Sequence, residues 1–256
     1  MYSSGRWSPV ELRKSIRAIL ALVMVNGIKP VIRSPLWLVV MLMYPLVLIF
    51  FIYIFAEYAI SEALIGGLVS LVVMSGVAIQ ADIVWYKVEL KFQDMAVASP
   101  TPPTVYMIGM AVSELAYSSP AIALFLALMG IKGMLGLSSI PMLIVSMLLC
   151  WLSSLSIGFY LSTRISDIRH IWALEGLISI VLSMLPPIYY PMGLLPEWAQ
   201  ILSMLVPTTH AALLAKEAVG IVSLTGYQRL TSLAILLLWT AALLVVAGKK
   251  SVWREP

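Results

Sequence analysis

The stretch KVELKFQDMAVASPTPPTVYMIG, residues 87–109, places charged residues and then a proline cluster between two long apolar stretches. A turn between two membrane spans needs only a few residues, and about twenty are used here. The segment is too polar for burial in lipid and too apolar for a free loop, and its prolines end any helix and favour an extended backbone. Residues 82–103 are therefore predicted to contain a short helix that lies across the ends of the spans and leaves apolar side chains for a partner.

The overall composition is that of a membrane protein. Of the 256 residues, 61% are apolar and 11% are charged, whereas a soluble domain has about half apolar and about a quarter charged residues. The net charge of +4 matters less in such a protein than the places where the basic residues fall. The single cysteine, Cys150, excludes an internal disulfide.

Long apolar runs predict an all-α membrane protein with six transmembrane helices in one domain, residues 1–256. A helix needs about 20 mostly apolar residues to cross the hydrocarbon core of a bilayer. The predicted spans are residues 36–56, 63–81, 104–131, 138–162, 171–190 and 230–248. The small residues of the second span, Gly66, Gly67, Ser70 and Gly76, favour close contact with neighbouring helices.

The basic residues predict how the chain is oriented. Cytoplasmic loops of membrane proteins are enriched in lysine and arginine. With both termini in the cytoplasm, 13 of the 16 lysines and arginines lie on the cytoplasmic side, and only Lys132, Lys216 and Arg229 remain outside. We therefore expect a multi-pass protein of the cell membrane with both termini cytoplasmic.

The first segment, residues 8–27, has the pattern of an amphipathic helix. Ser8, Pro9 and Glu11 match a capping box with proline just inside the helix, and Asn26-Gly27 is a helix-stop signal. Apolar residues recur on one side and basic residues on another, which predicts a helix in the inner headgroup layer with its bases toward anionic lipid. Because the basic residues and the helical pattern spread over more than about thirty residues, we expect no cleaved signal peptide.

The stretch PPIYYPMGLLPEWAQILSMLVPTTHAALLAKEAVG, residues 186–220, is broken by five prolines on the predicted outer side. Residues 197–205 have a helical pattern with Trp198 at the interface, and Thr208 or Thr209 is expected to cap a second helix. The stretch is too apolar for a free loop and too interrupted to span. It predicts a re-entrant hairpin, residues 191–220, packed against protein.

Two acidic residues, Glu114 and Glu175, fall inside predicted spans. An acidic side chain at the middle of a membrane helix opposes insertion by about 2.5 to 3.5 kcal/mol on translocon scales. Two interpretations stay open for each residue: it lines a transport path or relays protons, or it is a neutral carboxyl group bonded to a neighbouring helix.

The sequence contains no motif of an ATP-binding or catalytic site. It has no phosphate-binding loop, zinc-protease helix or nucleophile turn. His170 is expected in a short inner loop and His210 at a helix start, and neither has metal-ligand spacing around it. The chain is therefore expected to have no catalytic residue, to bind no metal and to hydrolyse no ATP.

The order of these pieces resembles that of the type 2 ATP-binding-cassette (ABC) export permeases over nearly the whole chain. VELKFQDMAVASPTPPTVYMIG is similar to the inner loop of that family, and YYPMGLLPEWAQILSMLVPTTHAALLAKEAV to its outer hairpin. The residues that match are Glu89, Met95 to Val97, Ser99-Pro100 and Gly109 in the loop, and Tyr190-Pro191, Leu195-Pro196, Trp198 and Pro207-Thr208 in the hairpin. The chain departs from the family at Phe92-Gln93-Asp94, where Gly-Thr is common, and at Glu114.

The resemblance implies a permease subunit that is driven by a separate ATPase subunit, which binds the ATP and Mg. It makes residues 82–99 a coupling helix docked in a groove of that ATPase. The implied docking residues are Glu89, Phe92, Asp94, Met95, Ser99 and Pro100. It further implies a second permease, as a homodimer or with a related chain, because six spans make half of such a transporter. Membrane lipid is an expected partner, and nucleic acid is not.

Two other classes remain open. An ion-coupled secondary transporter would use Glu114 and Glu175, but internal repeats are expected for such a carrier and the sequence has no convincing one. A non-transporting subunit or anchor is the third class. Long apolar spans with few charges favour a lipophilic compound as the substrate.

Overall fold

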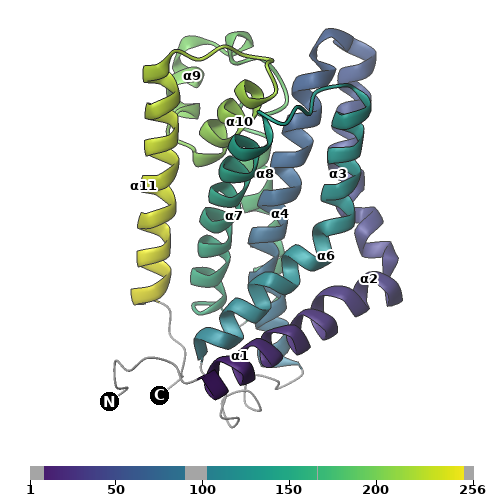
Figure 1. Cartoon of the computed structure of the whole chain (residues 1–256), viewed down its shortest axis with the longest axis vertical. Helices are drawn as coiled ribbons and strands as arrows, with labels where there is room; N and C mark the ends of the chain where they lie inside the picture. The colour runs from purple at the N-terminus through teal and green to yellow at the C-terminus, as the bar shows by residue number, and fades with distance from the viewer. Residues whose placement is uncertain (1–8, 90–102, 166, 251–256) are drawn as a thin grey trace.

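The computed structural model describes residues 9–89, 103–165 and 167–250, which form helices joined by short connections, with no strand in these ranges (Figure 1). In chain order the elements are α1 (Pro9–Leu22), the π-helix η1 (Val23–Ile28), α2 (Lys29–Arg33), α3 (Pro35–Phe55), the 3-10 helix η2 (Glu57–Ala59), α4 (Ile60–Val88), α6 (Pro103–Ile131), α7 (Ile140–Ser162), α8 (Ile168–Ser183), the 3-10 helix η3 (Met192–Leu194), α9 (Glu197–Ser203), α10 (Pro207–Ala218) and α11 (Gly226–Lys250).

In the described part of the chain, six helical segments are long and apolar enough to cross a membrane. Five of them, in α3, α4, α6, α7 and α11, confirm predicted spans. The sixth is the segment Glu11–Arg33. The protein is therefore a multi-pass, all-helical membrane protein.

The predicted span 171–190 is not among these six segments, and its C-terminal end is wrong. The corresponding helix, α8, has 16 residues and ends at Ser183. Pro186 and Pro187 come two and three residues after Met184, where the turn that follows the helix begins, and proline lacks the N–H group that a continuing helix needs. Residues 184–190 are turns and bends instead.

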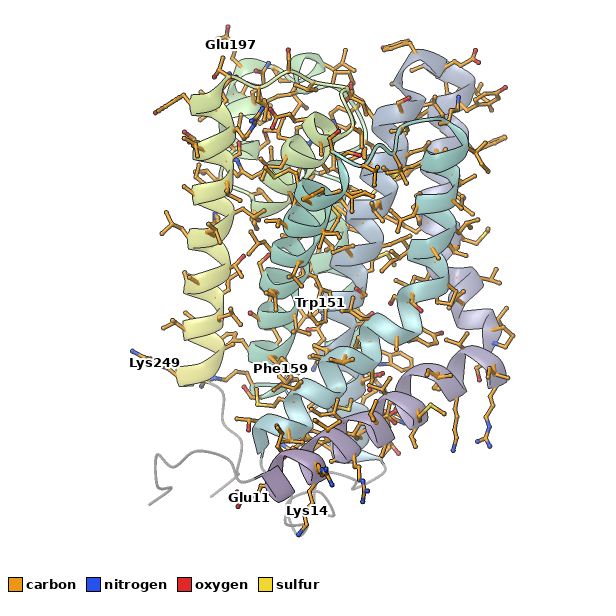
Figure 2. The ribbon with its side chains drawn as sticks, viewed as in Figure 1. Glu11, Lys14, Trp151, Phe159, Glu197 and Lys249 are labelled. Atoms are coloured by element: carbon orange, nitrogen blue, oxygen red, sulfur yellow. The ribbon has the colours of Figure 1, made fainter. Side chains whose placement is uncertain are left out.

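The helix α4 is the centre of the bundle and packs against α3, α6, α7, α8 and α10. Its glycines permit this, because a Cβ atom at Gly66 would lie 2.7 Å from Tyr189 Cα and one at Gly76 would lie 2.7 Å from Ser154 Cβ. A Cβ atom at Gly67 would overlap the ring of Phe125. The predicted close helix contacts of these small residues are confirmed. On α7, which packs beside α4, Trp151 and Phe159 face the bundle interior (Figure 2).

The helix α1 runs across one end of the bundle (Figure 1). At this end, called the α1 end below, α4 and α11 finish and α6 begins. The hairpin end is the opposite one, where α9 and α10 lie. The basic residues of the described chain that belong to the α1 end are Arg13, Lys14, Arg17, Lys29, Arg33, Lys87, Arg164, Arg169 and Lys249. The first and last described helices thus share the strongly basic end.

The predicted helix stop at Asn26-Gly27 is wrong. The helical backbone continues through the wide turn of η1 into α2, and this helical segment ends at Arg33. Gly27 is seated against α6, where a Cβ atom would lie 2.8 Å from the Ser113 carbonyl oxygen. The Asn26 side chain bonds to other helices instead of capping its own. The predicted cap, Ser8, lies outside the described residues.

Candidate functional site

Three carboxyl groups from three helices meet inside the bundle. Asp82 of α4 and Glu114 of α6 are hydrogen-bonded through their side chains. Glu175 of α8 lies close enough to interact electrostatically with both. Glu114 is only 5% exposed. A hydrogen bond between two carboxyl groups requires a proton on one of them, since an ionised carboxylate only accepts. This carboxyl cluster, Asp82, Glu114 and Glu175, can therefore hold a proton between two helices.

The helical continuity of α4 creates the cluster. The sequence pattern ended the second span at residue 81, but the helix runs without a break to Val88. Asp82 therefore stands on a membrane-spanning helix and faces α6, and is not part of a loop helix as predicted. Glu114 and Glu175 were identified from the sequence, whereas Asp82 was missed as their partner. An uninterrupted helical pattern from residue 60 to 88, with no proline or glycine near 82, was the available signal.

Tyrosines surround the cluster. Tyr86 and Tyr117 interact electrostatically with Asp82 and Glu114, and Tyr106 interacts with Asp82. Tyr86 also donates its hydroxyl proton to Asn26 Oδ1 over 3.2 Å. Within the described ranges, no group of three or more His, Cys, Asp or Glu side chains is arranged to hold a metal ion. The three carboxyl groups of the cluster are therefore not arranged as a metal site.

The predicted docking segment is described only at its edge. Glu89 is exposed and follows the last turn of α4, where its N–H group donates to the Trp85 carbonyl oxygen over 2.9 Å. The other predicted docking residues, Phe92, Asp94, Met95, Ser99 and Pro100, lie outside the described residues. The two helices that this segment connects, α4 and α6, carry Asp82 and Glu114.

The turn before α8 carries a well-defined cap. Asp167 accepts a hydrogen bond from the Arg169 backbone N–H over 2.8 Å. This bond to its ionised form lowers the pKa of Asp167, and the neighbouring His170 adds to the effect. His170 Nδ1 lies 3.4 Å from Asp167 Oδ2. The histidine is exposed, but it lies in the first turn of α8 and not in the short loop predicted for it.

The stretch after α8 contains the predicted broken segment. Tyr190 and Pro191 precede η3, Pro196 precedes α9, and Pro207 begins α10. The axes of α9 and α10 form an angle of 94° at the break between the two helices. Trp198 on α9 is 66% exposed, whereas nearly all of α10 is buried.

The predicted threonine caps of the second helix are wrong. Thr208 and Thr209 lie inside α10, which Pro207 begins without a side-chain cap. Thr208 Oγ1 donates to the Leu182 carbonyl oxygen over 2.7 Å, and Thr209 Oγ1 donates to that of Ser203 over 2.5 Å. The hydroxyl groups thus tie α10 to α8 and α9. His210 lies in the first turn, as expected, with Nε2 2.8 Å from the Met204 carbonyl oxygen.

A buried ion pair fixes α10 to the start of α4. Lys216 Nζ donates to Glu62 Oε2 over 2.6 Å, to the Pro187 carbonyl oxygen over 3.1 Å and to that of Tyr190 over 2.9 Å. Its side chain is 3% exposed and that of Glu62 is 13% exposed. All three ammonium protons have acceptors, which is what a buried lysine requires. Sequence reasoning treated Lys216 only as an outer base and missed this lysine clamp, as we call these four residues.

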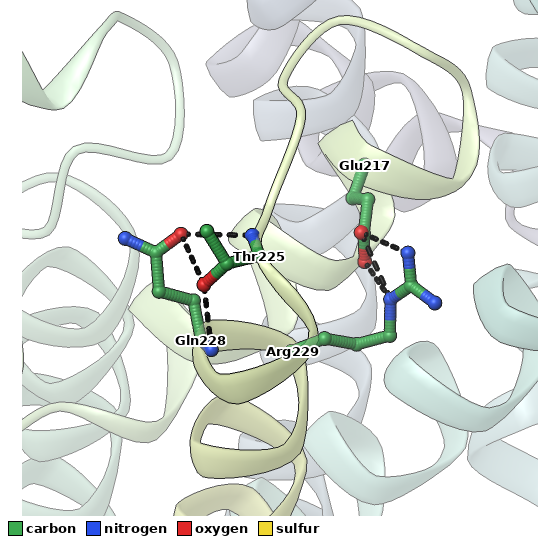
Figure 3. A network of polar contacts seen from close by, with 4 residues as sticks. All are labelled: Glu217, Thr225, Gln228 and Arg229. Atoms are coloured by element: carbon green, nitrogen blue, oxygen red, sulfur yellow. Dashed lines mark hydrogen bonds and ion pairs between the residues drawn. The ribbon is translucent and has the colours of Figure 1, made fainter.

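The connection from α10 to α11 is held by two further contacts (Figure 3). Arg229 donates from Nε and Nη2 to the Glu217 carboxylate, at 2.9 and 2.6 Å from Oε1. Thr225 and Gln228 form a reciprocal capping box, in which Thr225 Oγ1 accepts from the Gln228 N–H and Gln228 Oε1 accepts from the Thr225 N–H. The motif Thr-x-x-Gln was visible in the sequence and defines where α11 begins.

No protein-family model matches the sequence, and a comparison with curated proteins finds no match either.

Proposed function

We propose that this chain is the transmembrane permease subunit of an ATP-driven ABC exporter and forms half of the translocation path. The observation that supports it most is the bent α9–α10 pair, which is clamped to α4 at the end opposite to α1. The elements also follow the order that suggested an ABC export permease. A basic helix lies across one end, α4 connects to α6 at that end, and a broken helical hairpin lies at the other end.

In this proposal the ATP chemistry belongs to a separate ATPase subunit, which binds ATP and Mg. The ATPase docks on the connection between α4 and α6 at the cytoplasmic α1 end, through Phe92, Asp94 and their neighbours. Force applied there acts directly on the helices that carry Asp82 and Glu114. A second copy of the chain completes the path as a homodimer in the cell membrane, and the favoured cargo is a lipophilic compound.

The test replaces Phe92→Ala together with Met95→Ala. We expect less ATPase to co-purify with the permease and less permease-stimulated ATP turnover. The matched control is Lys132→Ala with Leu137→Ala, two exposed residues between α6 and α7 at the other end of the bundle. Unchanged recovery of the ATPase with the Phe92 and Met95 variant would contradict the docking site.

The carboxyl cluster favours a second candidate function, an ion-coupled secondary transporter. Asp82 and Glu114 share a proton, and Glu175 adds a third titratable group to the same place. Purified protein in sealed vesicles distinguishes the two candidates. Cargo movement that follows a proton gradient in the absence of nucleotide would support the carrier, and movement that requires the ATPase and ATP would support the exporter.

A further inference from the structure

The segment from residue 9 to 33, called the basic segment below, exposes both charge and apolar surface. Its exposed bases are Arg13, Lys14, Arg17, Lys29 and Arg33, and Glu11 is its only acid. Figure 2 places Lys14 at the bottom of the bundle, pointing away from it. Leu12, Ile16 and Leu20 follow one another at helical spacing beside these bases and are 52%, 47% and 57% exposed.

The opposite side of the basic segment is fixed to the bundle. A Cβ atom at Gly27 would lie 2.8 Å from the Ser113 carbonyl oxygen and 2.9 Å from Ala116 Cβ. Asn26 donates from Nδ2 to Met110 Sδ over 3.4 Å and accepts from Tyr86 over 3.2 Å. The segment therefore cannot turn its bases toward the bundle without losing contacts with both α4 and α6.

We propose that the basic segment binds the anionic lipid surface at the α1 end and that this binding sets the positions of α4 and α6. Water alone would leave the line from Leu12 to Leu20 unburied. At the headgroup boundary the apolar side chains enter the acyl region while the bases meet lipid phosphates. The course of α1 across the end of the bundle agrees with this placement (Figure 1).

The π-helix η1 is the joint through which binding is transmitted. Asn26 and Gly27, which contact α4 and α6, both lie in this wide turn, and Leu22 just before it packs against Gly109 of α6. Such turns occur often at functional positions of helices. Asn26 bonds to Tyr86, one turn beyond Asp82, and Gly27 contacts Ser113, the neighbour of Glu114. A displacement of the basic segment therefore moves the two helices that hold the carboxyl pair.

The test compares the full chain in bilayer discs of phosphatidylcholine with discs that also contain phosphatidylglycerol, using hydrogen exchange. We expect the anionic lipid to slow exchange by about tenfold or more in residues 9–33 and, more weakly, in residues 103–116. High salt reduces the effect because it screens exposed charges. The readout needs neither cargo nor ATPase, so its result is independent of the proposed function.

Two variants separate binding from transmission. Replacing Arg13→Gln, Lys14→Gln and Arg17→Gln, all exposed, removes the lipid effect in both regions. Asn26→Ala keeps the effect in residues 11–20 and loses it in residues 103–116. The matched control, Lys132→Gln at the hairpin end, responds like the unaltered chain.

Three results would overturn the inference. They are equal exchange in neutral and anionic bilayers, an unchanged lipid effect in the triple glutamine variant, and an equal effect of inorganic phosphate added to neutral discs. The last result would identify a site for a free anion instead of a lipid surface.

Discussion

The carboxyl groups of Asp82 and Glu114 are hydrogen-bonded to one another although they belong to different helices, α4 and α6. Neither residue could make this bond if both were ionised. The pair therefore links α4 and α6 through a shared proton, and the same two helices are joined in sequence by residues 90–102. The consequences can be measured without knowledge of the cargo.

Replacing Glu114→Ala should destabilise the bundle by about 1–3 kcal/mol, because it leaves the Asp82 carboxyl without its bonded partner in a buried place. Glu114→Gln should cost much less, since an amide can still donate to a carboxylate. Thermal unfolding of the purified variants in detergent checks this order. Equal destabilisation by alanine and glutamine would contradict the shared hydrogen bond.

The lysine clamp predicts a strong coupling between two residues far apart in the sequence. Lys216→Met should destabilise the folded protein by about 3–5 kcal/mol, because the Glu62 carboxylate stays largely buried without its cation. The double variant Lys216→Met with Glu62→Leu should be more stable than the single lysine variant. A double-mutant cycle measured by chemical unfolding tests this, and strictly additive effects would speak against the clamp.

The glycines of α4 predict where added volume is not tolerated. Gly67→Ala should destabilise by about 1–3 kcal/mol, because the new methyl group overlaps the Phe125 ring. Gly176→Ala on α8 is the matched control, since no atom lies within 4 Å of its Cβ position. It should be neutral or stabilising by about 0.5–1 kcal/mol. A comparison of unfolding temperatures distinguishes the two, and similar values would argue against the close contact.

The cap of α8 predicts a pH dependence. The backbone hydrogen bond from Arg169 lowers the pKa of Asp167, so its contribution to the helix start is complete above the usual aspartate range. The contribution is lost as the pH falls through the lowered pKa. Amide exchange in the first turn of α8, corrected for intrinsic pH effects, should therefore accelerate at acidic pH. Asp167→Asn keeps a cap that does not titrate, and the same acceleration in this variant would refute the cause.

The positions of the spans could be predicted from the sequence, because a helix that crosses a bilayer needs a long run of apolar residues and such runs are visible in the sequence. The ends of the helices could not. Asn26-Gly27 carries a stop signal, yet Gly27 contacts α6 and the helix continues. The charged residues after position 81 predicted a separate short helix across the ends of the spans, yet α4 continues to Val88 and carries Asp82 into the bundle. In both places a contact between distant segments outweighs the local preference.

The same limit applies to the candidate site. Glu114 and Glu175 were recognisable as costly residues in apolar runs, but only the packing of α4 between α6 and α8 brings them to Asp82. Thr208 and Thr209 are residue types that often cap helices, but here their hydroxyl groups form hydrogen bonds to neighbouring helices. The docking residues from Phe92 to Pro100 remain a prediction.

Lys216 of α10 bonds at once to Glu62 of α4 and to Pro187 and Tyr190 in the bend after α8, so three separate parts of the chain meet at its ammonium group. If one of these parts moved away from the others, the buried ammonium group of Lys216 would lose an acceptor. We therefore expect three parts to move together as one unit: the first turn of α4, the bend that follows α8, and the helix α10. In the proposed transporter, we therefore expect any passage at the hairpin end to open along the border of this unit and not through its middle.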